Sequence, residues 1–151
     1  MTLIFAYGSN MDWGQMHERC PSAQYVCAAK LMNHHLAFTR KSKNRGCGVS
    51  DVLPAEGQEV WGVVYRISED ELPSLDKKEG INSNSYVRRA GTVDQDGDKA
   101  RPLTVEIYFA VRQDNPPLPN QEYKNLIVSG AKHWNLSAEY ITELENIKVA
   151  P

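Results

Sequence analysis

The alternation of apolar and polar positions along the chain predicts short strands joined by tight turns, with helices between them. Residues 3–7 and 59–67 form the clearest apolar runs, and the second run predicts a strand buried on both faces. Further strands are expected at residues 23–31, 35–39 and 49–52, from residue 86 onwards, and at residues 103–111. Residues 54–57 are expected to form a turn, and Asp96-Gly97 favours a hairpin. The pattern therefore predicts about six to seven strands.

Helical segments are indicated by capping residues and by apolar residues at helical spacing. The expected N-cap residues, in order along the chain, are Asn10, Ser68, Asn120 and Ser137. The first helix is expected over residues 11–19, and Ser68 with Glu71 forms a capping-box pattern that opens a second helix. Gly80 is expected to end this second helix, on which residues 76–78 provide the solvated face.

Composition and charge narrow the classes of protein that the chain resembles. With 151 residues, of which 41% are hydrophobic, the chain is expected to form a single domain over residues 1–151. Its net charge of −2 argues against nucleic acid or an anionic membrane as a partner. No apolar run approaches the roughly 20 residues of a membrane span, and no signal-peptide pattern is present. The odd number of cysteines, three, indicates reduced thiols and a cytoplasmic protein.

One glutamate stands on the apolar face of a predicted helix. Leu72, Leu75 and Glu79 lie at positions i, i+3 and i+7 and therefore share a face. Burial of a carboxylate is unfavourable and raises its pKa towards the range of a useful general base. The alternative is a structural glutamate at the edge of the core, paired with Arg88 or Arg89. General acid–base chemistry at Glu79 is at least as well supported. Residues 76–78 already supply the solvated face of the helix, so Glu79 is not needed there.

A glycine turn follows the first predicted strand, in the segment Tyr7-Gly8-Ser9-Asn10. Gly8 can adopt backbone angles that other residues avoid, so the chain can turn sharply there. A strand, a glycine turn and a helix start together direct free backbone N–H groups towards one point. Such an arrangement can hold an anion or a developing oxyanion. The alternative interpretation is an ordinary tight turn.

Other polar residues are weaker candidates for chemistry. His34 and His35 are adjacent and would face opposite sides of a strand, so no metal site is predicted. Cys47 could be a nucleophile, but no activating group is near it in sequence, which favours a small buried residue. The basic segment 40–45 is expected to be a solvated loop; the alternatives are a nucleic-acid patch and a cationic attraction for an acidic substrate.

Four segments resemble, in the same order, those of the gamma-glutamyl cyclotransferase family, from about residue 3 to about residue 145. They are Tyr7-Gly8-Ser9-Asn10; Val60-Trp61-Gly62-Val63-Val64; residues 75–80 followed by Tyr86; and Pro116-Pro117-Leu118-Pro119 through Tyr123-Lys124 to Gly130-Ala131. The resemblance implies a small mixed α+β barrel of six to seven strands with short flanking helices and an active site in a cavity at the barrel edge. The match is weakest in the basic segment 40–45.

The resemblance also implies a reaction and the residues that perform it. The α-amino group of a small-molecule γ-glutamyl substrate would attack its own γ-carbonyl, giving 5-oxoproline and a released amine or amino acid, without a metal or an organic cofactor. The family's catalytic glutamate corresponds to Glu79. Its substrate-binding residues correspond to Tyr7, Gly8, Ser9, Asn10 and Tyr86, with Tyr108 and Tyr123 as further positions. The protein is expected to be a monomer or a homodimer.

Three other functions share these motifs or this fold. A γ-glutamylamine cyclotransferase would release a free amine, and a specialised member would remove a γ-glutamyl group from an acylated metabolite. A non-catalytic binding or interaction protein is the alternative from another class. The presence of both Glu79 and the segment at residues 7–10 favours an enzyme.

Overall fold

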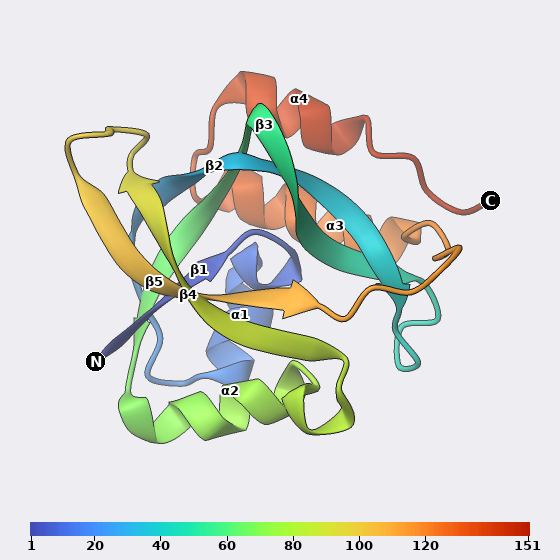
Figure 1. Ribbon diagram of the computed structural model, residues 1–151, viewed down its shortest axis with the longest axis horizontal. Coiled ribbons are helices and arrows are strands. Elements are labelled where there is room, and N and C mark those ends of the chain that lie inside the picture. The colour runs from blue at the N-terminus through green and yellow to red at the C-terminus, as the bar shows by residue number, and fades with distance from the viewer.

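The computed structural model describes residues 1–151 and contains a closed barrel of five strands with four α-helices around it (Figure 1). The strands are β1 (Thr2–Ala6), β2 (Gln24–Lys41), β3 (Gly48–Ile67), β4 (Tyr86–Gln95) and β5 (Pro102–Ala110). The helices are α1 (Trp13–Arg19), α2 (Leu72–Lys78), α3 (Gln121–His133) and α4 (Ala138–Glu145). Three short 3₁₀ turns lie at Ser9–Met11, Glu69–Glu71 and Ile81–Ser83.

The barrel order is β1-β3-β2-β4-β5, and the sheet is mixed. Every neighbouring pair is antiparallel except β1 and β5, which close the barrel in parallel through the pair Ile4 and Glu106. The β4–β5 hairpin turns at Asp96 and Gly97, both with positive φ, as the sequence predicts. The expected class, a small mixed α+β barrel with flanking helices, is therefore confirmed.

The strand count is lower than expected because two long strands each absorb two predicted ones. β2 and β3 pair along their whole length, from Gln24 opposite Arg66 to Lys41 opposite Gly48. Bulges interrupt this pairing. The pairing stops at Met32 and Glu59 and resumes at His34 and Pro54. Between these pairs, residues 55–58 bulge out opposite Asn33, which has a positive φ. The predicted turn at residues 54–57 is therefore wrong. Bulges let a strand carry irregular residues without ending.

The helix caps agree with the sequence at three of four places. Asn120 and Ser137 cap α3 and α4 with their side chains, and Ser68 caps the 3₁₀ turn before α2. Asp12, not Asn10, caps α1, because the chain first makes the 3₁₀ turn Ser9–Met11. The side chain of Asn10 is therefore free for another contact, and it donates to Glu79.

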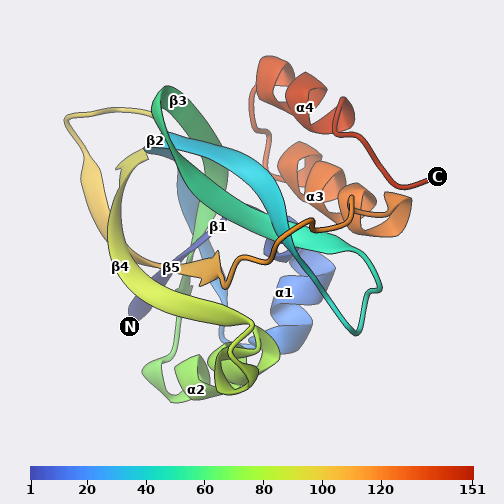
Figure 2. The same ribbon diagram turned by 45° about the vertical axis from the view of Figure 1, so that its right-hand side comes forward.

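The helices cover two parts of the barrel, as Figures 1 and 2 show: α3 and α4 stack on one side, and α2 lies below β4 and β5. One core cluster fills the space between the barrel and α1–α4, with Tyr65, Leu75, Ile127 and Leu144 among its buried members. A second cluster fills the barrel interior. No helix combines the length and the apolarity that crossing a membrane requires.

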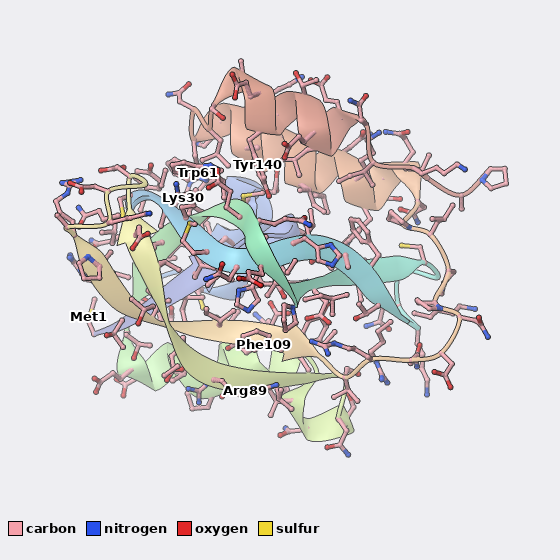
Figure 3. The ribbon with its side chains drawn as sticks, turned by 45° about the horizontal axis from the view of Figure 1, so that its top comes forward. Met1, Lys30, Trp61, Arg89, Phe109 and Tyr140 are labelled. Carbon is pink, nitrogen blue, oxygen red and sulfur yellow. The ribbon has the colours of Figure 1, made fainter.

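Two cation–π contacts lie at different places on the barrel. Lys30 of β2 lies over the ring of Trp61 of β3 at 5.6 Å, at the end of the barrel where Tyr140 of α4 packs (Figure 3). Arg89 of β4 lies over the ring of Phe109 of β5 at 4.8 Å. Arg89 therefore packs across the hairpin and makes no ion pair with Glu79.

Candidate active site

All eight residues that the sequence singles out line one small pocket of about 50 Å³. It lies between the residues that follow β1 and the C-terminal end of α2. Glu79 comes from α2, Tyr86 and Tyr108 from β4 and β5, and Tyr123 from α3. The remaining four are Tyr7, Gly8, Ser9 and Asn10. Five segments of the chain therefore meet at one point.

Gly8 is required by close packing. Its φ is −114°, so the turn does not use the left-handed region. A Cβ on Gly8 would overlap the Oγ of Ser50 on β3. The chain can therefore pass this close to β3 only without a side chain at position 8.

The Gly8-Ser9-Asn10 segment carries backbone donors without partners. The N–H of Gly8 makes no hydrogen bond within the chain. The N–H groups of Ser9 and Asn10 open a 3₁₀ turn, where the first donors have no acceptor inside the turn. These donors border the pocket and can receive an anionic oxygen.

Glu79 occupies the C-terminal end of α2, directly before Gly80, whose φ of 80° turns the chain away. Its side chain is 14% exposed. Its Oε1 accepts a hydrogen bond from the Asn10 amide and lies 3.3 Å from Nη1 of Arg19. The partner is thus Arg19, neither Arg88 nor Arg89. The other carboxylate oxygen, Oε2, has no hydrogen-bond partner in the chain.

Burial raises the pKa of the Glu79 carboxyl above its ordinary value. The Arg19 guanidinium, the Asn10 amide and Arg45 act in the opposite direction, because each favours the ionised form, but they do not cancel the effect of burial. A carboxylate with a raised pKa and one unpartnered oxygen can accept a proton and later return it.

The four tyrosines use their hydroxyls to hold the walls of the pocket. Tyr7 donates to the carbonyl of Tyr108, and Tyr86 donates to the carbonyl of Ser50. The Tyr123 hydroxyl accepts from the backbone N–H of Ser50 at 3.0 Å and lies 2.9 Å from its Oγ. Burial raises the pKa of all four phenols, so they stay neutral. These rings therefore form a rigid, uncharged wall.

The fourth tyrosine is tied to α2. The Tyr108 hydroxyl donates to Asp76 at 2.6 Å, and Arg88 holds both oxygens of Asp76 at 2.9 and 3.1 Å. Asp76 is therefore not on a solvated face, as the sequence suggests, but joins α2 to β4 and β5. Because Glu79 lies one turn later on the same helix, this contact fixes its position relative to the barrel.

A larger cavity of about 440 Å³ opens from the small pocket. The two share Ser9, Glu79, Tyr86 and Tyr123. The outer walls come from the loop between β2 and β3, the end of α1 and the end of α2. The basic segment 40–45, expected to be a solvated loop, is exposed at Lys41, Lys43 and Asn44 and also lines this cavity. We call it the outer cavity and the small one the inner pocket.

Comparison with known proteins assigns the family. Residues 59–144 match the AIG2-like family. The human gamma-glutamylcyclotransferase is 34% identical over 97% of this chain and 78% of its own length, and the bovine one is 36% identical over the same shares. The chain belongs to the gamma-glutamylcyclotransferase family. A solved gamma-glutamyl cyclotransferase superposes with a TM-score of 0.91 at 33% identity, covering 99% of this chain and 89% of that one.

As a member of this family, the chain is an enzyme of the gamma-glutamylcyclotransferase type. The AIG2-like match includes Glu79, Tyr86, Tyr108 and Tyr123 but begins after the segment at residues 7–10. The full-length relatives extend the likeness over nearly the whole chain. The resemblance inferred from four short segments is therefore confirmed.

Several residues of the candidate site of this cyclotransferase are not evident from sequence. Gln15 donates to Ser9 Oγ at 2.8 Å and to Asn10 at 2.9 Å, and Arg45 donates to Gln15 at 2.6 Å. Arg19 and Ser50 are the other site residues that the sequence does not reveal. The only sequence feature that marks Arg19 is its place in the last turn of α1. Cys47 is buried, in agreement with its structural interpretation. No three His, Cys, Asp or Glu residues gather as a metal-binding group would.

Proposed function

We propose that the enzyme cyclises a γ-glutamyl amide to 5-oxoproline by intramolecular aminolysis and releases an amino acid or an amine. The observation that carries this proposal is the placement of one buried carboxylate, Glu79, beside the unpartnered N–H groups of residues 8–10 in one small pocket. Aminolysis of an amide needs a proton acceptor and a stabilised oxyanion, and these two features supply both.

In the proposed mechanism Glu79 transfers two protons, one after the other, from the attacking nitrogen to the leaving nitrogen. Its ionised carboxylate takes a proton from the α-ammonium group of the substrate, and the neutral amine then attacks the γ-carbonyl carbon. A C–N bond forms, the carbonyl oxygen becomes negative, and Glu79 gives its proton to the leaving nitrogen as the old amide bond breaks. The regenerated carboxylate then takes the remaining extra proton from the ring nitrogen and passes it to the released amine, which departs as an ammonium group. Acid–base assistance of this kind raises the reaction rate by about 10²–10⁴-fold. The raised pKa of Glu79 supports this role.

The Gly8-Ser9-Asn10 segment is proposed to hold the substrate through backbone N–H groups. The anion that they receive is either the tetrahedral oxyanion or the α-carboxylate of the substrate. An oxyanion donor typically contributes about 2.7–4 kcal/mol to the stabilisation of the transition state. The tyrosine wall is proposed to fold the γ-glutamyl chain so that amine and carbonyl meet, which lowers the entropic cost of reaction.

The proposed chemistry requires no external nucleophile and no cofactor, because the attacking amine and the carbonyl belong to one substrate molecule. The inner pocket contains two serines, Ser9, which is held by Gln15, and Ser50, which pairs with Tyr123, and neither needs a nucleophilic part. The cations around the outer cavity favour a leaving group that carries a carboxylate over one that carries only an ammonium group. This favours γ-glutamyl amino acids or peptides over γ-glutamylamines.

The test is to incubate the enzyme with γ-glutamyl compounds and to detect 5-oxoproline and the released partner by mass spectrometry. The panel contains a γ-glutamyl amino acid, a γ-glutamylamine and the α-linked isomer of the same dipeptide. We expect 5-oxoproline together with free amino acid from the γ-linked dipeptide and no amino acid from the α-linked isomer. Failure to form 5-oxoproline from every γ-linked compound would reject the proposal.

A further inference from the structure

The outer cavity has a charge opposite to that of the whole chain. Seven of its seventeen lining residues are lysine or arginine, and Glu79 is its only acidic residue. The protein as a whole has a net charge of −2. A cavity lined by one sign of charge concentrates ligands of the other sign, so this face of the enzyme attracts anions.

Three of these cations are not engaged within the protein. The ammonium groups of Lys41, Lys43 and Lys77 make no ion pair, and no hydrogen bond to another residue involves their Nζ atoms. Arg19, in contrast, is paired with Glu79, and Arg45 is held by Gln15 and lies over the Tyr123 ring at 4.9 Å. The cavity therefore offers several charges that only a ligand or solvent can neutralise.

The position of these cations matches the leaving-group side of the proposed substrate. The inner pocket, at about 50 Å³, cannot contain a whole γ-glutamyl dipeptide. Because Ser9, Glu79, Tyr86 and Tyr123 border both spaces, a γ-glutamyl group in the inner pocket directs its leaving group into the outer cavity. At about 440 Å³ the outer cavity lies in the range of small-ligand sites.

We propose that the preferred leaving group carries at least two negative charges, as an acidic amino acid or a short acidic peptide does, and that Lys41, Lys43 and Lys77 recognise its second charge. A single α-carboxylate would leave most of these cations without a partner. The inference rests on the proposed function, because it assigns the part of the γ-glutamyl substrate that lies outside the inner pocket.

The direct test compares γ-glutamyl-glutamate with γ-glutamyl-glutamine, two substrates of nearly equal shape that differ by one charge. We expect kcat/KM to be about tenfold higher for the glutamate compound at an ionic strength of about 0.1 M, where the Debye length is about 10 Å. The ratio should fall towards one at about 1 M, where the Debye length is about 3 Å. The difference should lie in KM, because these charges are remote from the reacting atoms.

The residue assignment is tested with the triple variant in which Lys41, Lys43 and Lys77 are replaced by glutamine. We expect it to lose most of the preference for γ-glutamyl-glutamate while kcat changes little. The matched control replaces three exposed lysines outside the cavity, Lys99, Lys132 and Lys148, by glutamine and removes the same total charge. The control should keep the preference.

Each outcome separates this inference from the function on which it rests. If both substrates yield 5-oxoproline at equal kcat/KM, or if the triple variant keeps the preference, the assignment of an acidic leaving group to these lysines is wrong and the cyclotransferase chemistry stands. If the control loses the preference as well, net charge and not the cavity is responsible, which also overturns the inference. If no γ-linked compound yields 5-oxoproline, the proposed function fails first.

Discussion

Glu79 shows how a single residue balances opposing influences. Burial raises the pKa of its carboxyl and so favours the protonated form, whereas Arg19, Asn10 and Arg45 favour the carboxylate. All the protein contacts fall on Oε1, so Oε2 can face a substrate without first breaking a hydrogen bond. The residue is therefore held in place by one oxygen and available for proton transfer through the other.

Replacement of Glu79 by glutamine should abolish most of the activity and preserve the fold. The amide keeps the shape of the side chain but cannot accept the proton of the substrate amine. We expect the rate of 5-oxoproline formation to fall by about 10²–10⁴-fold, with an unchanged circular dichroism spectrum. Glu69→Gln, at a side chain that is 75% exposed, is the matched control. A Glu79→Gln variant as active as this control would disprove the general-base role.

Arg19 is expected to set the lower end of the pH range in which the enzyme works. Because the guanidinium lowers the pKa of Glu79, Arg19→Gln should raise that pKa further. A base must be ionised to act, so the acidic limb of the kcat/KM profile should move to higher pH in this variant. The measurement is kcat/KM against pH for both proteins with one substrate. An acidic limb that stays in place or moves to lower pH would contradict the assigned effect.

At the scale of elements, the geometry of the site depends on two contacts between elements. The 3₁₀ turn Ser9–Met11 passes against β3, and α2 is held to β4 and β5 through Asp76, Arg88 and Tyr108. The first contact places the backbone donors and the second places Glu79. Their relative position is therefore determined by packing between elements that are far apart in the sequence.

Gly8→Ala should disturb the first of these contacts. The added Cβ would overlap Ser50 Oγ, so the turn or the Ser50 side chain must move. Since misplacement of positioning groups costs reaction rate, we expect kcat to fall by at least about tenfold. In a Ser50→Ala background, where that oxygen is absent, the same substitution should cost less. Equal losses in both backgrounds, measured by steady-state kinetics, would show that the contact with Ser50 is not the cause.

At the scale of the whole molecule, the local pattern predicted the helix caps and the hairpin turn better than the strand boundaries. The apolar runs, the caps Asn120 and Ser137 and the hairpin at Asp96-Gly97 depend on neighbouring residues and were predicted correctly. The division of β2 and β3 was not, because bulges keep a strand continuous across residues that look like a turn.

The helical spacing of Leu75 and Glu79 correctly placed the glutamate next to the core. The identity of its partner could not be predicted in the same way. Arg19, Arg88 and Arg89 are all basic, and only the packing of α1 against α2 selects Arg19. Likewise, the role of Ser50 arises from the close passage of another segment and leaves no local pattern.

The raised pKa of Glu79 also has a consequence for the stability of the whole protein. A carboxyl whose pKa is higher in the folded state than in the unfolded state favours folding while it is protonated. That contribution is lost as the pH rises from the ordinary glutamate range, about 4.3, through the folded pKa. Glutamine carries no such group. The Tm of Glu79→Gln relative to the native protein should therefore be higher at about pH 8 than at about pH 4.

The measurement is thermal unfolding of both proteins and of Glu69→Gln across that range. Comparing each variant with the native protein at both pH values cancels the effects of the substitution that do not change with pH. The remaining change reports the titration of Glu79, to which its ion pair with Arg19 contributes. The exposed control shows what removal of a surface carboxylate does on its own. A relative Tm that stays flat or falls with pH would mean that Arg19, Asn10 and Arg45 outweigh burial. Glu79 would then be a structural ion pair, and its function as a base would lose its physical support.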